Sequence, residues 1–378
     1  MICKALEDAF SGGIQTHVSS LTCKLISNGN QVTILTAGNQ IYNRKRKHIN
    51  GAEIITLPYF PKKFSFGLAN FLGEMSFNFM ANKWIQKHIK EFDLIHVQGR
   101  SGIMIKPKSV GLPVVTTVHR LMSVERNWNQ CDYTNPLDRF LHLGFSEYFE
   151  SRILKNSAAI ITVSQNTKTE ILSFYNKVDE KKIEIIPNGV DIPIQLFGGQ
   201  KLKNLLFVGR LTKVKGAEVL VEAMRYTNKN IKLSMIGEGP ISEDLKKLVD
   251  SYKLGDRIEF LGPKTRSEVY SVMSSSYALV LPSFHESQGI VMLEANAHSL
   301  PVIATRSSGI TEFISNGING LLFTKGSYKD MAKKINRIYN EPELATGLGE
   351  NGRKIMIDEY GWDEIAKSTL KIYDRIAC

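Results

Sequence analysis

The stretch YALVLPSFHESQGIVMLEANAHSLPVIATRS, residues 277–307, contains an apolar run, a polar loop, a helix-length segment and a second apolar run. This order of strand, loop, helix and strand is typical of parallel sheets, in which a helix connects neighbouring strands. The apolar runs are continuous rather than alternating, which indicates strands covered by helices on both faces. We therefore predict an α/β fold.

The same order recurs over both halves of the chain. The runs that we predict as strands are QVTILTA (31–37), FDLIHVQ (92–98), PVVTTVH (113–119), AAIITVS (158–164), NLLFVGR (204–210), KLSMIGE (232–238), IEFLG (258–262), YALVLPS (277–283) and PVIATRS (301–307). Because 378 residues exceed the usual size of one core, we expect two doubly wound domains with a cleft between them.

We place the domain boundary in IEIIPNGVDIP, residues 183–193, where a Pro-Asn-Gly cluster breaks regular structure. The predicted domains are residues 1–188 and 189–378. We expect residues 327–378 to be helical with a break at Gly361-Trp362, and the last helix is a candidate to pack back on the N-terminal domain.

The formal net charge of +11 makes nucleic acid, anionic lipid and phosphorylated small molecules candidate partners. Residues 1–190 carry 23 basic and 15 acidic side chains, so most of the excess lies in the N-terminal half. Part of it is the run Arg44 to Lys47, which we interpret as a solvated loop.

The four cysteines lie far apart and form no C-x-x-C pair, which argues against a zinc site and against a disulfide framework. The N-terminal segment does not resemble a signal peptide, and no apolar run is long enough to span a bilayer as a helix. We expect a cytoplasmic protein without a metal ion or other cofactor.

Two places carry the chemistry of an anion-binding site. Gly12 and Gly13 precede a helix-length segment, so backbone N–H groups there could approach a phosphate. Arg210 follows a strand, and Lys215 stands at the start of the next helix; two fixed cations suit a diphosphate. The alternative is a plain turn in the first case and two solvated cations in the second.

Glu286 and Glu294 mark a site for a polyol. Glu286 lies in the loop after a strand, and Glu294 lies on the next helix, which Gly289 opens. Carboxylates accept hydrogen bonds from vicinal hydroxyls, and the amides from Ser287 through Ile290 to Val291 could hold an anion or a hydroxyl. Glu294 has apolar neighbours in sequence and needs a partner, for which a ribose diol would serve.

Together these features resemble family 4 of the glycosyltransferases, which has the two-domain GT-B fold. The motifs, in order, are SGGIQTHV, TTVH, TVSQ, IPNGVD, VGRLTKVKG, IGEGP and a pair of glutamates with seven residues between them, and they extend along nearly the whole chain. The resemblance implies two Rossmann-like domains facing a central cleft, with the acceptor bound mainly by the first domain and the nucleotide-sugar donor by the second.

The resemblance also implies a role for each residue. Arg210 and Lys215 would hold the diphosphate in place of a metal ion, and Glu294 would bind the ribose. Glu286 and the amides after it would hold the transferred sugar, with His119 against one of its hydroxyls and Gly13 near the phosphate. The implied reaction is retaining transfer of a hexosyl residue from a UDP- or GDP-sugar to a glycan, lipid-linked or small-molecule acceptor.

The sequence departs from the family in two places. Gln288 stands where relatives often carry an aromatic residue, and this departure affects how the site would fit the sugar and the base. The first strand contains Lys4, Glu7 and Asp8 where an apolar run is expected, which bears on the geometry of the glycine loop.

Other functions stay open at this point. A nucleotide-sugar epimerase of the same fold would need a similar donor site, and a basic nucleic-acid-binding protein would account for the charge alone. Segment 58–85 contains eight aromatic residues and two neighbouring lysines, so contact with an anionic membrane is a further hypothesis; packing on the N-terminal core is the alternative that we favour.

Overall fold

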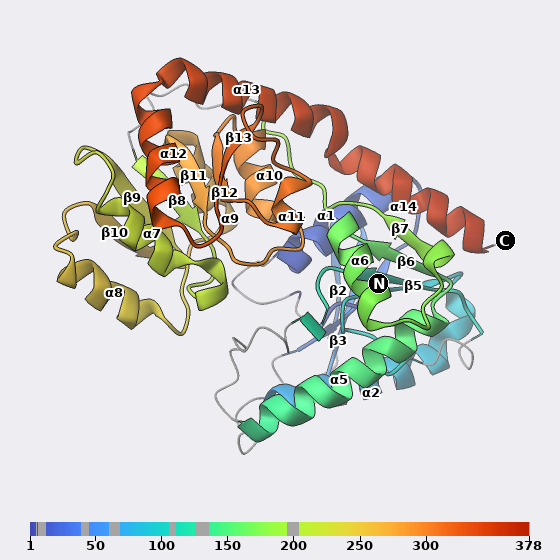
Figure 1. Ribbon diagram of the computed structural model, residues 1–378. Coiled ribbons are helices and arrows are strands. Elements are labelled where there is room, and N and C mark those ends of the chain that lie inside the picture. Colours follow the sequence, from blue (N-terminus) through green and yellow to red (C-terminus); the bar gives the residue numbers. More distant parts are fainter. Residues whose placement is uncertain are drawn as a thin grey trace. The chain divides into compact units, whose positions relative to one another are not determined.

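The computed structural model forms two compact units (Figure 1). Unit 1 comprises Met1–Pro187 with Trp362–Cys378, and unit 2 comprises Asn188–Gly361. The division falls one residue before the predicted boundary, and the last helix belongs to unit 1. The structure describes residues 1–4, 6, 13–38, 45–59, 69–105, 111–121, 123–124, 136–194 and 204–377.

Unit 2 is built on a parallel six-stranded sheet with the strand order β10-β9-β8-β11-β12-β13. Since β8 and β11 are neighbours in this order, their carboxyl ends lie side by side at one edge of the sheet. The strands are β8 (Asn204–Val208), β9 (Lys232–Ile236), β10 (Ile258–Gly262), β11 (Ala278–Leu281), β12 (Val302–Thr305) and β13 (Gly320–Phe323).

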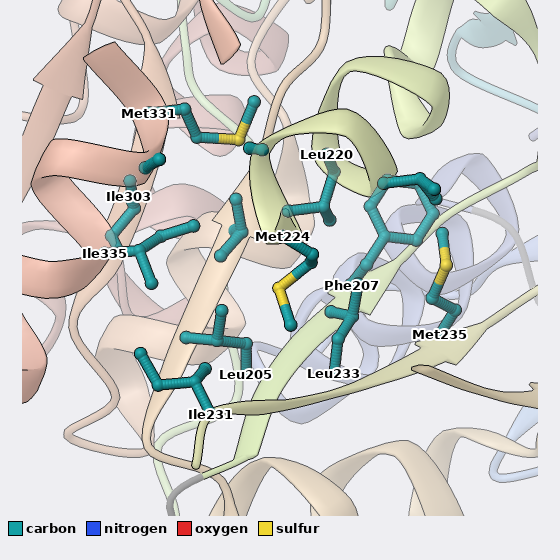
Figure 2. Close-up of a cluster of buried hydrophobic side chains, with 14 of the residues drawn as sticks. Leu205, Phe207, Leu220, Met224, Ile231, Leu233, Met235, Ile303, Met331 and Ile335 are labelled. Atoms are coloured by element: carbon teal, nitrogen blue, oxygen red, sulfur yellow. The ribbon is translucent and has the colours of Figure 1, made fainter. Parts of the chain in front are cut away.

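Helices cover both faces of this sheet, as the continuous apolar runs predict. Leu205 and Phe207 of β8 face a core formed with α7 and α12 (Figure 2), while Leu206, between them in sequence, packs on the opposite side with residues of α9 and α10. The helices are α7 (Ala217–Met224), α8 (Ser242–Ser251), α9 (Arg266–Ser275), α10 (Ile290–Ala297), α11 (Ser308–Thr311), α12 (Tyr328–Asn340) and α13 (Pro342–Glu359), with a 3-10 turn η4 (Lys213–Lys215).

Unit 1 contains two ladders, β1-β3-β2 and β4-β5-β6-β7. Ile2 joins them, because it forms parallel bridges to Leu35 on one side and to Val97 on the other. Met1 to Cys3 therefore complete the sheet, despite the polar residues that follow in sequence. The strands are β1 (Thr33–Ala37), β2 (Lys45–Ile49), β3 (Ala52–Leu57), β4 (Ile95–Gln98), β5 (Val114–Val118), β6 (Ala159–Thr162) and β7 (Ile183–Ile185).

The helices of unit 1 also lie on both faces of its sheet. Leu21 of α1 and Trp362 of α14 pack in one cluster with Val115 of β5, whereas Phe77 of α2 and Ile153 of α5 pack with Val114. The helices are α1 (Gly13–Ser27), α2 (Ala69–His88), α5 (Pro136–Asn156), α6 (Gln165–Phe174) and α14 (Trp362–Ala377), with the 3-10 turns η2 (Ile89–Glu91) and η3 (Glu180–Lys182).

All nine predicted strands are confirmed, but the interpretation of Arg44 to Lys47 as a loop is wrong. Arg44 lies outside the described residues, and Lys45–Ile49 forms β2, antiparallel to β3. The turn between them has Asn50 and Gly51 at positive φ, which suits the twist of a two-residue hairpin. The side chains of Arg46 and Lys47 are exposed, so this strand remains solvated on the outside of the unit.

The segment rich in aromatic residues, 58–85, is described only in part. Phe60, Phe64, Phe66, Lys62 and Lys63 lie outside the described residues, whereas Phe77 and Trp84 are buried in the core and Phe79 is exposed. Among the helices that the structure describes, none is both long and apolar enough to cross a membrane.

Candidate functional site

The two cations that we predicted for a diphosphate and the carboxylate that we predicted for a sugar follow the carboxyl ends of β8 and β11 in unit 2. Arg210 lies in the bend after β8, and its side chain is exposed. Lys215 ends the 3-10 turn η4, one residue before Gly216 and α7, rather than starting the helix. Glu286 lies in the loop after β11, as predicted.

Gly216 allows the turn that carries Lys215 to lie against the loop after β11. Its φ of 67° is in the left-handed region, and a Cβ at this position would overlap the Pro282 carbonyl oxygen. The backbone N–H of Phe284 donates to the carbonyl of Val214 at 2.7 Å, which fixes the two loops together. Lys215 is thereby held beside Glu286.

Lys215 and Glu286 form an ion pair within unit 2. The Lys215 ammonium donates to Glu286 Oε1, and the Ser283 hydroxyl donates to the same oxygen at 2.9 Å. Burial opposes ionisation of Glu286, but the Lys215 charge and these hydrogen bonds outweigh it, so the pKa of Glu286 lies below its ordinary value. Two groups predicted to bind different parts of a donor thus contact each other.

Glu294 lies on α10, as predicted, and also has partners within the protein. Tyr270 donates from its hydroxyl to Glu294 Oε1 at 2.9 Å, and Arg266 Nη2 lies 3.4 Å from the same oxygen. Burial nevertheless raises the pKa of Glu294 above its ordinary value, although Arg266 and Tyr270 favour the charged form. Glu294 thus has the partner that its apolar surroundings require within the protein, and its contact with a ribose stays a prediction.

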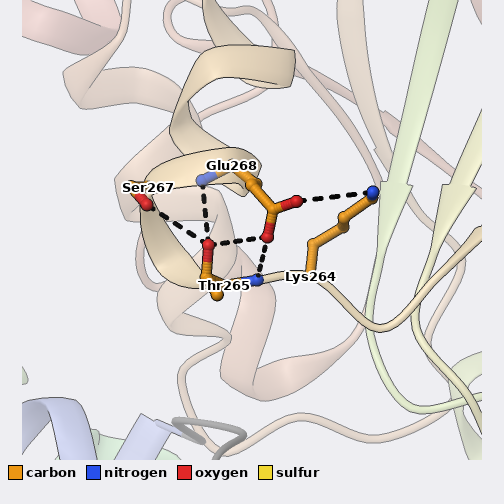
Figure 3. Close-up of polar contacts among 4 residues, drawn as sticks. All are labelled: Lys264, Thr265, Ser267 and Glu268. Atoms are coloured by element: carbon orange, nitrogen blue, oxygen red, sulfur yellow. Dashed lines mark hydrogen bonds and ion pairs between the residues drawn. The ribbon is translucent and has the colours of Figure 1, made fainter.

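A capping box fixes the start of the helix that supplies these partners (Figure 3). The Thr265 hydroxyl accepts from the backbone N–H of Glu268, and the Glu268 carboxylate accepts from the backbone N–H of Thr265 at 2.8 Å. Arg266 and Tyr270 follow at the first and fifth positions of α9. They share one face of the helix, and Arg266 Nε donates to the Tyr270 hydroxyl at 2.5 Å.

Arg266 and Tyr270 were missed in the sequence analysis. The T-x-x-E pattern at residues 265–268 was a visible signal for the start of a helix, but it does not indicate which residues the helix faces. Arg266 Nη2 also lies 3.0 Å from Asp191 Oδ2, so one guanidinium joins α9 to the IPNGVD motif.

Ser287, Gly289, Ile290 and Val291 form the connection from Glu286 to α10. Gly289 caps the helix at a φ of 75°, and Ile290 and Val291 begin its first turn. Ser287 is buried, and its hydroxyl has no hydrogen-bond partner among the residues that the structure describes. A Cβ on Gly309 would overlap the Glu286 carbonyl oxygen, so α11 packs directly on this connection.

Gln288, the residue that stands where relatives often carry an aromatic one, binds the start of unit 2. Its side chain is buried, and its Oε1 accepts from the backbone N–H of Asn188 at 2.8 Å and from the Asn188 side-chain amide. The side chain therefore joins the Glu286 loop to the first residue of unit 2.

The predicted residues of unit 1 form a separate group. Gly13 is the first residue of α1, and Gly12 lies outside the described residues. His119 follows β5, its Nε2 lies 3.0 Å from Gln98 Oε1, and its ring centroid lies 4.8 Å from that of His17. Burial and the neighbouring His17 and His96 hold the pKa of His119 well below its ordinary value, so the ring is neutral at pH 7.

Comparisons with known proteins agree with this arrangement. Residues 11–193 match the family model described as "Glycosyltransferase Family 4", and residues 194–355 match "Glycosyl transferases group 1". An uncharacterised glycosyltransferase of Methanocaldococcus jannaschii is 30% identical over 97% of this chain and 96% of its own.

Solved structures show the same fold. Sucrose-phosphate synthase from Thermosynechococcus elongatus is similar with a TM-score of 0.79 and 24% identity, over 97% of this chain and 94% of that chain. HepE of Anabaena, solved in complex with UDP and glucose, has a TM-score of 0.73 and 17% identity over 98% and 97% of the two chains. With two Rossmann-like units and matches along both halves, the chain belongs to glycosyltransferase family 4 and is a glycosyltransferase of the GT-B fold.

Proposed function

We propose that the protein transfers a hexosyl residue from a nucleotide sugar, a UDP- or GDP-sugar, to a glycan, lipid-linked or small-molecule acceptor, with retention of configuration and without a metal ion. The observation that carries this proposal is the group of Arg210, Lys215 and Glu286 at the carboxyl ends of two adjacent strands. Binding of UDP and glucose by HepE, which has the same fold, supports a donor of this class.

Lys215 has two tasks in this proposal. Without donor, it neutralises Glu286. When a diphosphate binds, the ammonium turns to the phosphate together with Arg210, and the Glu286 carboxylate becomes available to accept hydrogen bonds from the sugar hydroxyls. The exchange replaces the ion pair of Glu286 with hydrogen bonds, which matters because the Glu286 side chain is only 10% exposed and a buried carboxylate without partners is costly.

The two cations stabilise the charge that develops on the diphosphate as the bond from the anomeric carbon to the phosphate oxygen breaks. The acceptor oxygen bonds to the same face of that carbon, and its proton passes to the departing phosphate oxygen. Glu294 accepts hydrogen bonds from the ribose, and the amides from Ser287 to Val291 hold the sugar or the phosphate. For Gly13 and His119 of unit 1, the resemblance to the family is the support for the proposed roles toward the phosphate and a sugar hydroxyl.

A thermal-shift screen with UDP-, GDP- and ADP-sugars tests the donor. A ligand that binds only the native state stabilises it by about 2.7 kcal/mol at a concentration of 100 times its Kd, so the correct donor raises the Tm. The donor that raises the Tm is then supplied with candidate acceptors, and the anomeric configuration of the product is read by NMR. A product of inverted configuration, or no shift with any nucleotide sugar, contradicts the proposal.

The absence of a metal requirement has its own test. We expect turnover to persist in excess chelator, because Arg210 and Lys215 supply the positive charge that a divalent ion supplies elsewhere. Loss of turnover with chelator, restored by Mg²⁺ or Mn²⁺, contradicts this part of the proposal alone.

We also propose peripheral contact with an anionic membrane through α2 and α5, two helices that contact each other. The support is a set of exposed aromatic side chains, with exposed basic residues on the same helices: Phe79, Phe140, Phe145 and Tyr148, with Lys83, Lys87, Arg152 and Lys155. Sedimentation with anionic liposomes at low salt tests it, and failure to sediment removes it.

A further inference from the structure

A buried chain of hydrogen bonds connects His119 to the last helix of the protein. It runs within unit 1 from His119 of the loop after β5, through Gln98 and His96 of β4, to Tyr373 of α14. His119 Nε2 lies 3.0 Å from Gln98 Oε1, Gln98 Nε2 lies 3.2 Å from His96 Nε2, and His96 Nδ1 lies 2.5 Å from the Tyr373 hydroxyl. The exposed fractions of Gln98 and His96 are 1% and 2%.

The chain has a consistent arrangement of hydrogens. Burial holds the pKa of His96 well below its ordinary value, so this ring is neutral and carries one hydrogen. With that hydrogen on Nδ1, His96 donates to Tyr373, and the single lone pair of its Nε2 is shared between the Gln98 amide at 3.2 Å and the Thr117 hydroxyl at 2.6 Å. Gln98 Oε1 then faces His119 and can only accept, so the hydrogen of His119 is on Nε2.

Burial requires that both ends of the Gln98 amide have hydrogen-bond partners, and it couples the orientation of the amide to the hydrogens of both histidines. A buried amide that loses one hydrogen bond costs about 1–3 kcal/mol, and here both ends of the Gln98 amide have partners. Reversing the amide would require His96 to move its hydrogen to Nε2 and to accept from Tyr373 instead. The orientation of one glutamine therefore determines which nitrogen of His119 carries the hydrogen.

We propose that Gln98 is a positioning residue, held by His96 and Tyr373, that keeps the hydrogen of His119 on Nε2 and so leaves Nδ1 to accept a hydrogen bond from a hydroxyl of the transferred sugar. The proposal rests on the role of His119 in the proposed function. It assigns direction to that contact: the sugar donates and the histidine accepts.

The first test is NMR of protein labelled with ¹⁵N-histidine, without substrate. A long-range ¹H–¹⁵N correlation distinguishes the two neutral forms of each ring, and the His119→Asn variant identifies the signals of His119 among those of the eight histidines. We expect His119 with its hydrogen on Nε2. A ring with its hydrogen on Nδ1, or an even mixture of the two forms, overturns the proposal.

The second test compares two variants of Gln98. Gln98→Met keeps the length but removes the acceptor, so we expect His119 to populate both forms and kcat to fall about tenfold at nearly unchanged donor KM. Gln86→Met, at an exposed position of α2, is the matched control and should change neither. An unchanged kcat in folded Gln98→Met contradicts the proposal.

Gln98→Glu keeps an acceptor for His119 Nε2–H but adds a negative charge. The other titratable groups near His119 are His17 of α1 and His96 of β4, with Tyr373 of α14 beyond them. The carboxylate raises the pKa of His119, so His119 loses its acceptor nitrogen at a higher pH than in the wild type. We expect kcat within about threefold of wild type at pH 8 and an acidic limb displaced to higher pH. An acidic limb that does not move overturns the proposal.

The proposed sugar transfer and the proposed role of Gln98 can be contradicted separately. If the protein transfers no sugar, the proposed function fails, while the NMR result on His119 still stands or falls by itself. If transfer is normal but His119 carries its hydrogen on Nδ1, only the role of Gln98 fails.

Discussion

Glu286 and Glu294 lie eight positions apart on one loop and helix, yet their surroundings differ in kind. Glu286 is paired with a lysine that ends a turn after another strand, and this pairing lowers its pKa. Glu294 faces Arg266 and Tyr270 of α9, but burial dominates and raises its pKa. The partner of Glu286 is thus a group that a diphosphate can attract away, whereas Arg266 is also bound to Asp191.

This difference indicates which glutamate is stabilised by the protein and which is stabilised by a ligand. The Lys215 pair makes the ionised form of Glu286 favourable without donor. Glu294 is held in a position where its charge is costly, so hydrogen bonds from a bound ligand would have most to contribute there. Four variants test this difference between the two glutamates.

Lys215→Ala should have the largest effect, because it removes a diphosphate cation and leaves Glu286 without its partner. We expect kcat/KM to fall by about 10³-fold, as for loss of a group that stabilises developing charge. Steady-state kinetics measure the loss, and circular dichroism establishes that the protein is folded. Lys213→Ala, at an exposed position of the same turn, is the control and should stay within about threefold. Activity of Lys215→Ala within tenfold of wild type would falsify its role.

Glu294→Gln should raise the donor KM by about 30-fold with a smaller change in kcat, since hydrogen bonds to a charged acceptor contribute about 1.5–3 kcal/mol. The pKa of Glu294 is raised above the ordinary carboxyl value of 4.5. As the pH falls, the donor KM of the wild type should therefore begin to rise while the pH is still above 4.5. Donor KM measured from pH 8 downward shows the rise, and the variant should lack it. An identical pH profile in both proteins would contradict this assignment.

Glu286→Gln should destabilise the protein without ligand by about 2 kcal/mol at pH 7, because Lys215 loses the partner of a half-buried ion pair. The folded-state pKa of Glu286 is lowered, so its stabilisation is present above 4.5 and is lost as the pH falls through the lowered value. Urea unfolding should show the difference from wild type shrinking below pH 4.5. Glu294→Gln is the matched comparison and should cost less than about 1 kcal/mol; equal costs would remove the distinction between the two sites.

Tyr270→Phe should have the smallest effect, because it removes one of the two partners of Glu294 and keeps the ring. We expect about a threefold increase in donor KM at pH 7. The hydroxyl favours the charged form, so without it the pKa of Glu294 rises further and the acidic rise in KM moves to higher pH. A movement to lower pH would show that the hydroxyl does not act on Glu294.

Much of the fold could be predicted from the sequence because buried parallel strands are continuously apolar. Four of the strands that the structure describes were missed, and two of them, Ala52–Leu57 and Gly320–Phe323, are largely apolar. Lys45–Ile49 is polar and becomes a strand only by pairing with β3, and Ile183–Ile185 and Gly320–Phe323 are short segments beside turns. Pairing of this kind is a tertiary property that local composition does not determine.

The candidate site could be predicted as a set of residues but not as a set of contacts. The ends of strands indicated Arg210, Lys215, Glu286 and Glu294 because loops at those ends meet at one edge of a parallel sheet. Nothing local indicated that Lys215 would pair with a residue 71 positions away, or that Gln288 would bind Asn188. Those contacts depend on which strands are neighbours.

Unit 1 is assembled from both the first and the last parts of the chain, since α14 supplies Trp362 and Tyr373 to its core. During synthesis the segment that closes this core emerges from the ribosome only after all of unit 2. Unit 2 is contiguous and can fold first. Until then Val115 and Ile161 of the N-terminal half have Leu21 and Leu25 of α1 as apolar neighbours but lack those that α14 supplies.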